Sequence, residues 1–249
     1  MQANRQSLNL TNITLGIVCP MANEQDTACH FVKEVLQHCR GFAQVRFFAI
    51  LDRVSRDRTQ KLLEQLSVQI PELCVIWSPE NRCVVDAYVR GYQEAIAAGC
   101  DWILEIDAGY SHQPQDIPQF FSKMLEGYDC VFGSRFCRGG SMTGNWQRYW
   151  ISYGGSILTN LILGTKLKDM TSGFELFERN TLLQVLQKGL RSRGHFFQTE
   201  IKFYCHQFTI AEVPIQYKVL SNSVNQSVVQ EAFKNLGILA KERWQRKKL

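Results

Sequence analysis

The sequence lacks several features that assign a chain to a common class. It has no CxxC pair, no zinc-finger spacing and no RNA-binding signature, so nothing in it predicts a nucleic-acid partner. It also lacks an internal repeat, a low-complexity tract and a linker that would separate two independent domains. Its 249 residues, 45% of them apolar, suit one α/β domain or two tightly joined halves.

Long apolar runs are absent as well. The longest stretch without a charged residue, Tyr149 to Thr165, contains three glycines and several polar residues, and it is shorter than the ~20 apolar residues that span a bilayer. The segment Met1 to Asn12 is polar and has no signal-peptide core. The nine cysteines, several of them in apolar runs, indicate reduced thiols. We therefore expect a cytoplasmic protein, soluble or peripheral at the cytosolic face of a membrane.

Strand-like and helix-like segments alternate through the first half. Short apolar runs at 13–19, 45–51, 73–77, 102–106 and 129–133 predict strands, and helical spacing follows the first three of them, with Asn23 as the N-cap of the first helix. Repeated βα units of this kind predict an α/β fold with a mostly parallel central sheet flanked by helices. The pattern changes after about residue 135. There we expect a helix over Trp146–Leu163, a strand near Phe174, a helix near Leu182–Leu190, a strand through Val213–Ile215 and a C-terminal helix.

Polar residues gather where the predicted strands end. Ligands of such sheets bind outside the carboxyl ends of the strands, and these ends carry Pro20, Asn23, Glu24, Asp52, Asn81 and Asp107. Asp57 has two equally good interpretations, a ligand contact or the N-cap of the helix that follows Thr59. These residues predict a binding site along one edge of the sheet.

Seven short motifs occur in a fixed order along nearly the whole chain. They are PMANE at 20–24, DRVSRDRT at 52–59, DAGYSHQP at 107–114, GSRF at 133–136, DMTSGFELF at 169–177 and FFQTEI at 196–201 with EVPIQY at 212–217. With them the chain resembles the family 2 inverting glycosyltransferases, and within these the polyprenyl-phosphate branch, similar to dolichol-phosphate-mannose synthases. The resemblance implies a GT-A fold over residues 13–225, with a donor half to about 135 and an acceptor half from about 136. A polar arm at 1–12 and a basic helix at 226–249 would flank it.

The resemblance also implies roles for single residues. The donor would be a GDP- or UDP-hexose whose phosphates share Mg²⁺ or Mn²⁺ with Asp107. The donor-binding set would be Pro20, Asn23, Glu24, Asp52, Asp57 and Asn81. Arg135 and Arg148, with Lys168 as a weaker candidate, would bind the phosphate of a lipid-phosphate acceptor. Asp169 would act as a base if the acceptor were a hydroxyl instead.

The chain departs from the family pattern at several positions. Gly109 stands where the family has the second Asp of its Asp-x-Asp motif, Arg53 replaces a second acid after Asp52, and Cys83-Val84-Val85 replaces Gly-Leu-Gly. Glu105, two residues before Asp107 on the same face of the strand, or His112 could supply the missing metal contact, although for His112 a structural hydrogen bond is the stronger interpretation. These departures leave two alternatives open. One is a soluble family 2 transferase that acts on a sugar or protein hydroxyl, and the other is a non-catalytic nucleotide-sugar binding protein.

Aromatic and basic residues in the second half suggest a membrane surface as a partner. The predicted helix at 146–163 is aromatic nearly all round, and the last residues, KERWQRKKL, place Trp244 among cations. Both features are typical of interfacial helices near anionic lipid. Core packing of the aromatics and favourable placement of cations at a helix C-terminus would explain them equally simply.

Overall fold

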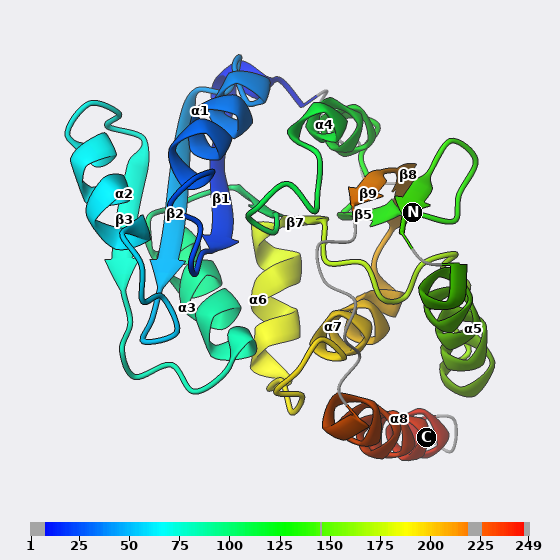
Figure 1. Cartoon of the computed structure of the whole chain (residues 1–249). Coiled ribbons are helices and arrows are strands. Elements are labelled where there is room, and N and C mark those ends of the chain that lie inside the picture. The colour runs from blue at the N-terminus through cyan, green and yellow to red at the C-terminus, as the bar shows by residue number, and fades with distance from the viewer. Residues whose placement is uncertain (1–7, 145, 219–225, 247–249) are drawn as a thin grey trace.

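A seven-stranded sheet forms the centre of the molecule (Figure 1). The computed structural model describes residues 8–144, 146–218 and 226–246. The strands lie in the order β3-β2-β1-β4-β7-β5-β8, and all pairs are parallel except those that β7 makes with β4 and β5. Their bounds are β1 Thr14–Pro20, β2 Gln44–Leu51, β3 Leu73–Trp77, β4 Trp102–Glu105, β5 Cys130–Ser134, β7 Glu175–Glu178 and β8 Ile210–Pro214. The predicted α/β fold with a mostly parallel sheet is confirmed.

Helices cover both faces of this sheet. Alternation along β1 sends Leu15 and Ile17 into the core on one face and Val18 into the core on the other, as a two-residue period requires. One face is covered by α1 Ala28–His38, α2 Thr59–Ser67 and α4 Ile117–Leu125, and the other by α3 Val84–Ala97, α6 Arg179–Gln187 and α7 Phe197–Tyr204. Gly91 allows α3 to lie close to the sheet, because a Cβ there would come within 2.3 Å of Cγ1 of Val18.

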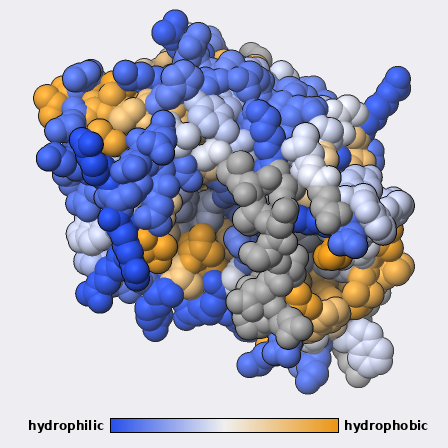
Figure 2. Space-filling view, in the orientation of Figure 1, coloured by the Kyte–Doolittle hydropathy of each residue, from blue (hydrophilic) through white to orange (hydrophobic). Residues whose placement is uncertain are grey.

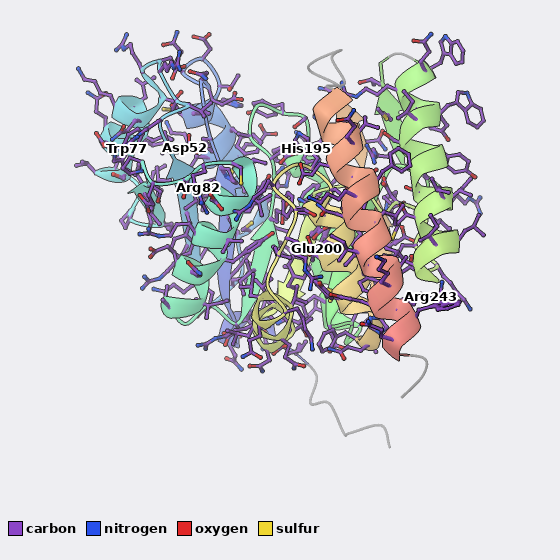
Figure 3. The ribbon with its side chains drawn as sticks, turned by 90° about the horizontal axis from the view of Figure 1, so that it is seen from below. Asp52, Trp77, Arg82, His195, Glu200 and Arg243 are labelled. Carbon is purple, nitrogen blue, oxygen red and sulfur yellow. The ribbon has the colours of Figure 1, made fainter. Side chains whose placement is uncertain are left out.

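Two longer helices lie together beside this three-layer body. They are α5 Trp146–Leu163, whose bounds match the predicted helix, and α8 Gln226–Arg246, and both views show them side by side (Figures 1 and 3). Nη1 of Arg243 on α8 donates to the carbonyl oxygen of Ile162 near the end of α5, at 2.7 Å. A two-stranded sheet of β6 Ser141–Thr143 and β9 Gln216–Lys218, and the short 3-10 helices at Leu10–Asn12, Pro114–Asp116 and Cys205–Gln207, complete the fold.

The first helix begins later than the sequence predicts. Asn23 is not its N-cap, since α1 starts at Ala28 after Thr27. Asn23 instead has a φ of 60°, and its amide joins two loops, donating to the carbonyl oxygen of Val54 and accepting from the N–H of Arg56. A contact made across 31 residues of sequence thus takes the place of local capping.

Candidate functional site

A polar cavity of about 240 Å³ opens beyond the carboxyl ends of β4 and β5. Its lining comes from loops and helices that are distant in sequence, and its polar side chains include Asp107, His112, Arg135, Arg148, Gln198 and Tyr217. The sequence motifs therefore converge in space, because the strand order brings the loops after β4 and β5 and the loop before the antiparallel β7 to the same edge. Three predicted site residues, Asp107, Arg135 and Arg148, line the cavity directly.

Asp107 follows β4 and faces this cavity with a side chain that is 39% exposed. The hydroxyl of Tyr88 donates to its Oδ1, and its own N–H donates to Nδ1 of His112 at 3.1 Å. Because Nδ1 accepts this hydrogen bond, the neutral ring of His112 carries its proton on Nε2. His112 is buried, stacks on Phe174, and burial lowers its pKa. His112 thus holds the Asp107 loop in place as a neutral ring, which agrees with its structural interpretation.

Glu105 occupies a different layer from Asp107. Both side chains point toward α3, as the two-residue period predicts, but Glu105 is fully buried and accepts hydrogen bonds from Tyr92 and Gln198. Burial, reinforced by the charge of Glu175 opposite it on β7, raises the pKa of Glu105 well above its ordinary value. The expectation that Glu105 supplements Asp107 at a metal is therefore corrected, because a carboxyl that is fully buried and hydrogen-bonded to Tyr92 and Gln198 is not among the residues that line the cavity.

Behind Glu105 lies a buried ion pair that the sequence did not suggest. Nζ of Lys202 on α7 lies 2.6 Å from Oε1 of Glu175, and neither side chain is exposed. Lys202 also donates to the carbonyl oxygen of Ser172. Burial raises the pKa of Glu175 to about 7, although the charge of Lys202 opposes the shift. This polar layer connects β7 to α7 directly beneath the cavity.

Arg135 and Asp169 form a second buried pair. Nε and Nη2 of Arg135 donate to Oδ2 and Oδ1 of Asp169 at 2.7 and 2.8 Å, a bidentate arrangement. Burial works to raise the pKa of Asp169, but the Arg135 guanidinium outweighs burial and holds that pKa below its usual value. The guanidinium also packs 5.3 Å from the ring centroid of Tyr217. Asp169 is fully buried in this pair, which conflicts with the expectation that it serves as a general base.

The space around Gly109 is taken by Glu24. Gly109 has a φ of +71°, and a Cβ added to it would lie 2.6 Å from Oε1 of Glu24. Glu24 itself is fixed by the hydroxyl of Thr27, which donates to its Oε2 at 2.6 Å, while its N–H donates to Oγ1 of Thr59 at 2.7 Å. A carboxylate from the loop after β1 thus lies beside the position where the family pattern places its second Asp.

The remaining donor-side candidates lie in two loops that are hydrogen-bonded to each other. Oδ1 of Asp57 accepts from the N–H of Thr59 at 3.0 Å, and its Oδ2 accepts from the N–H of Gln25 at 3.0 Å. Asp57 is not the N-cap of α2, which is Arg58, but its carboxylate accepts from the N–H of the first helical residue and ties the two loops together. Oδ1 of Asp52 accepts from the N–H of Val54 at 2.9 Å.

The loop that replaces the family's Gly-Leu-Gly lies next to the cavity. Cys83 precedes α3 in an extended conformation, and Val84 contributes its side chain to the cavity lining. Pro20 ends β1, and the N–H of Asn81 closes a turn on the carbonyl oxygen of Ser78. Cys83 and Val85, which stand where the family pattern has its two glycines, restrict the backbone of this loop more than glycines would.

An apolar groove of about 420 Å³ adjoins the polar cavity. It runs between α5 and α8, where Ile151, Leu158, Val229, Phe233 and Leu236 line it. Ser152, Thr171 and His195 line both the groove and the cavity, so the two spaces meet. Figure 3 shows His195 beside α8.

The sequence matches the profile of the glycosyl transferase family 2 over residues 16–186. The chain belongs to this family. The matched segment runs from β1 to α6 and includes the strand ends that shape the cavity. The chain is therefore a glycosyltransferase.

Two curated relatives support a narrower grouping. An undecaprenyl-phosphate mannosyltransferase of Micrococcus luteus is 29% identical over 194 residues, which cover 75% of this chain and 79% of the relative. A polyprenol monophosphomannose synthase of Mycolicibacterium smegmatis is 25% identical over 205 residues, which cover 81% of this chain and 76% of the relative. The resemblance to the polyprenyl-phosphate branch is thus confirmed.

Solved structures of the same architecture include glucosyl-3-phosphoglycerate synthase of Mycobacterium tuberculosis. Its complex with UDP superposes with a TM-score of 0.67 at 15% identity, covering 92% of this chain and 80% of that one. Its complex with Mn²⁺, UDP and phosphoglyceric acid gives a TM-score of 0.63 at 15% identity, covering 93% and 78%. At this identity the likeness establishes the GT-A fold of our family 2 chain.

The residues that line the cavity fit a divalent metal that takes most of its ligands from a bound substrate. Within the described part of the family 2 chain, no three His, Cys, Asp or Glu side chains come together as a self-contained metal site. A single carboxylate such as Asp107 suits Mg²⁺ or Mn²⁺ when the phosphates of a bound substrate and water supply most of the other ligands. Asp107 faces a polar cavity, which leaves room for such a shared metal.

Several cavity residues were not singled out from the sequence. Tyr88, Gln198, Tyr217 and His195 all line the cavity, and two of them lie in motifs quoted above, Gln198 in FFQTEI and Tyr217 in EVPIQY. The uncharged residues of those motifs could therefore have been predicted to line the site, as the acidic residues were. For Tyr88 the sequence offers less, only its position in the first turns of the helix that follows the Cys83-Val84-Val85 loop.

Proposed function

We propose that this glycosyltransferase moves a hexose from a GDP- or UDP-hexose to the phosphate of a polyprenyl lipid, with inversion, at a membrane surface. In a single displacement, an oxygen of the acceptor phosphate bonds to the anomeric carbon while the bond from that carbon to the nucleoside diphosphate breaks. The names of both curated relatives contain a polyprenol or its phosphate, which supports an acceptor of this class.

One observation carries the acceptor assignment. The polar cavity and the apolar groove share Ser152, Thr171 and His195. A molecule with a phosphate at one end and a long apolar chain at the other fits this pair of spaces, since its phosphate would lie by Arg148 and its chain between α5 and α8. A sugar hydroxyl acceptor would leave the groove without a ligand.

The state of Asp169 supports an acceptor that is already an anion. A hydroxyl nucleophile needs a base to remove its proton, whereas a phosphate needs only cations that position it. Asp169 is committed to Arg135 by two hydrogen bonds. We infer that Arg148 contacts the acceptor phosphate and that Asp169 holds Arg135 in place rather than removing a proton.

On the donor side, Asp107 would hold Mg²⁺ or Mn²⁺ together with the diphosphate. When bound, the metal neutralises the charge that develops on the leaving nucleoside diphosphate. Glu24, Asp52 and Asn81 would accept or donate hydrogen bonds to the base and ribose. Asn23 and Asp57 would act one step removed, by fixing the two loops that carry those residues.

The outer surfaces of α5 and α8 support a position at the membrane. Trp146, Trp150, Ile151 and Leu161 on α5 and Trp244 on α8 are exposed. Figure 2 shows apolar side chains gathered on this side of the molecule. None of the helices in the described ranges is long and apolar enough to cross a bilayer. Exposed indole rings beside basic residues are typical of contact with the lipid headgroup region.

The test is transfer of labelled hexose from a panel of GDP- and UDP-sugars in the presence of Mg²⁺ or Mn²⁺. Each donor is offered a short polyprenyl phosphate, the matched prenol without phosphate, and a soluble sugar. We expect product only with the prenyl phosphate, with the opposite anomeric configuration to the donor. Asp107→Asn should lower turnover by more than ~100-fold, because stabilisation of developing charge is worth several kcal/mol.

Two other results would replace this proposal. Equal transfer to the unphosphorylated prenol or to the soluble sugar would identify a hydroxyl-acceptor transferase. Binding of a nucleotide sugar without turnover on any acceptor would identify a non-catalytic binding protein, an alternative suggested by Gly109 and by Cys83-Val84-Val85 in place of Gly-Leu-Gly.

A further inference from the structure

Two tyrosines on one face of α3 contact two carboxyl groups at the end of β4. The hydroxyl of Tyr88 donates to Oδ1 of Asp107, and the hydroxyl of Tyr92 donates to Oε2 of Glu105. Four residues of helix rise about 6 Å, and two residues of strand rise about 6.7 Å. Side chains at i and i+4 of α3 are therefore in register with side chains at i and i+2 of β4.

The two contacts lie at different depths. Tyr92 and Glu105 are both fully buried, and Gln198 donates to the other oxygen of Glu105. Tyr88 and Asp107 line the cavity. The Tyr92–Glu105 hydrogen bond thus lies in the protein interior, and the equivalent Tyr88–Asp107 hydrogen bond lies at the cavity.

The ring of Tyr88 is held firmly. It is 3% exposed and packs 5.1 Å from Phe197 and 6.3 Å from Tyr92, measured between ring centroids. The ring is therefore confined, and its hydroxyl points at Oδ1 of Asp107. Packing from two helices, α3 and α7, defines where this donor lies.

We infer that Tyr88 is a positioning residue for Asp107. Its hydroxyl donates to Oδ1 and fixes the plane of the carboxylate, which would leave Oδ2 to bind a cation held jointly with the donor phosphates. This inference rests on the proposed function, because it needs Asp107 to act at a metal shared with the donor. Tyr88 itself is assigned no contact with the metal.

Gly109 explains why the orientation of Asp107 by Tyr88 matters in this chain. With a second Asp, two carboxylates would fix the metal from different directions. A single carboxylate must be held in one orientation by its surroundings, since a side chain that rotates freely loses entropy each time it binds a ligand. Hydrogen bonds that orient a metal ligand typically change metal affinity 10- to 100-fold.

Tyr88→Phe is the test, and Tyr92→Phe is its matched control. Each removes one hydroxyl from the same helix face, and each leaves a carboxyl without its donor. Binding of Mn²⁺ is measured by electron paramagnetic resonance in the presence of GDP or UDP, alongside the melting temperature of each variant. We expect Tyr88→Phe to weaken nucleotide-dependent Mn²⁺ binding about 10- to 100-fold. Tyr92→Phe should lower the melting temperature while leaving Mn²⁺ affinity within about twofold, because Glu105 lies outside the cavity.

A double variant separates positioning from a general effect on structure. If Tyr88 acts through Asp107, adding Tyr88→Phe to Asp107→Asn should leave the metal-independent affinity for GDP or UDP unchanged. In turnover assays, the KM for Mn²⁺ should rise in Tyr88→Phe while the KM for the acceptor stays constant. A merely structural role would move both parameters, and would lower binding in the Asp107→Asn background too.

The outcomes distinguish this inference from the function on which it rests. If the wild-type protein binds Mn²⁺ with nucleotide, Asp107→Asn loses that binding and Tyr88→Phe keeps it in full, Tyr88 is not a positioning residue and the proposed function stands. If Tyr92→Phe weakens Mn²⁺ as much as Tyr88→Phe, the effect is structural and the inference is wrong. If the wild-type protein shows no Mn²⁺ binding that depends on nucleotide and on Asp107, the metal role of Asp107 fails, and the inference fails with it.

Discussion

The carboxylate of Glu24 lies against Gly109, so close that a Cβ on Gly109 would come within 2.6 Å of Oε1. This relationship explains the glycine in DAGY. The backbone there is left-handed, with a φ of +71°, and the space a side chain would need is filled by an acid from another loop. Glu24 thus fills the space that a side chain at position 109 would need, although it is not among the residues that line the cavity with Asp107.

We expect Gly109→Ala to destabilise the protein more than Gly189→Ala does. Gly189 has a similar φ of +75° but nothing within 4 Å of an added Cβ, so it reports the cost of the backbone alone, about 1 kcal/mol. Urea unfolding of both variants measures the difference. In a Glu24→Ala background the excess cost at Gly109 should disappear, and an excess that persists would show that Glu24 is not the obstacle. For Gly109→Asp we expect a loss of stability too, since a second negative charge would lie beside Glu24.

Arg148→Ala should raise the KM for a prenyl phosphate acceptor about tenfold or more while the donor KM stays within about twofold, because a charge-assisted contact to phosphate is lost. Steady-state kinetics with each substrate varied in turn provide the measurement.

Arg135→Ala is expected to behave differently. It would leave Asp169 buried without its partner, which typically costs ~3–5 kcal/mol of stability. A stable Arg135→Ala protein with only an acceptor defect would place Arg135, rather than Arg148, at the acceptor phosphate.

Glu175 should make stability fall as pH rises from about 5 to 7. Its pKa is about 7 in the folded protein and about 4.5 in the unfolded chain, so between these values the folded state binds more protons. The stabilisation is complete below the unfolded pKa and is lost as pH rises through the folded pKa, with a slope of at most about 1.4 kcal/mol per pH unit. Urea unfolding at a series of pH values tests this. Glu175→Gln should flatten the slope in that window, and an unchanged slope would assign the titration to another group.

Replacing Trp146 and Trp150 together by alanine should weaken sedimentation with anionic vesicles. These side chains are exposed on α5, where they would insert among lipid headgroups. Trp77→Ala is the control, because Trp77 is also exposed but lies on the other side of the molecule from Arg243 of α8 (Figure 3). Binding should also fall as salt rises. Equal loss in the control, or no loss in the double variant, would exclude α5 as the membrane contact. Arg243 is unsuited to this test because it donates to the carbonyl of Ile162 and joins α8 to α5.

Much of the fold follows from patterns that are local in sequence. The strand at Leu73–Trp77 and the helix at Trp146–Leu163 have the predicted bounds, because apolar spacing and chain polarity determine them within one segment. Asn23 shows where such reasoning ends. Its type suits a helix cap, but its contacts are to Val54 and Arg56, and no local pattern predicts a partner so far along the chain.

The site was predictable as a list of acids but not as an arrangement. Asp107 lines the cavity as expected. Glu105 is also acidic and lies on the same face as Asp107, yet it is buried under Tyr92, Gln198 and β7. The sequence of its own strand does not predict these neighbours. Likewise the pairing of Arg135 with Asp169 depends on how two loops meet, so the acid that looked like a base is held as a counter-ion.

The place of β7 in the sheet has a consequence for how the chain is made. β7 lies between β4 and β5 and runs antiparallel to both, yet its residues follow those of β5 in the sequence by about forty positions. Until Glu175–Glu178 leave the ribosome, β4 and β5 cannot be joined, and each presents an open apolar edge of the kind that recruits other strands. Nascent chains that stop before this point should therefore need protection from aggregation, and the need should end only when β8 has covered the other edge of β5.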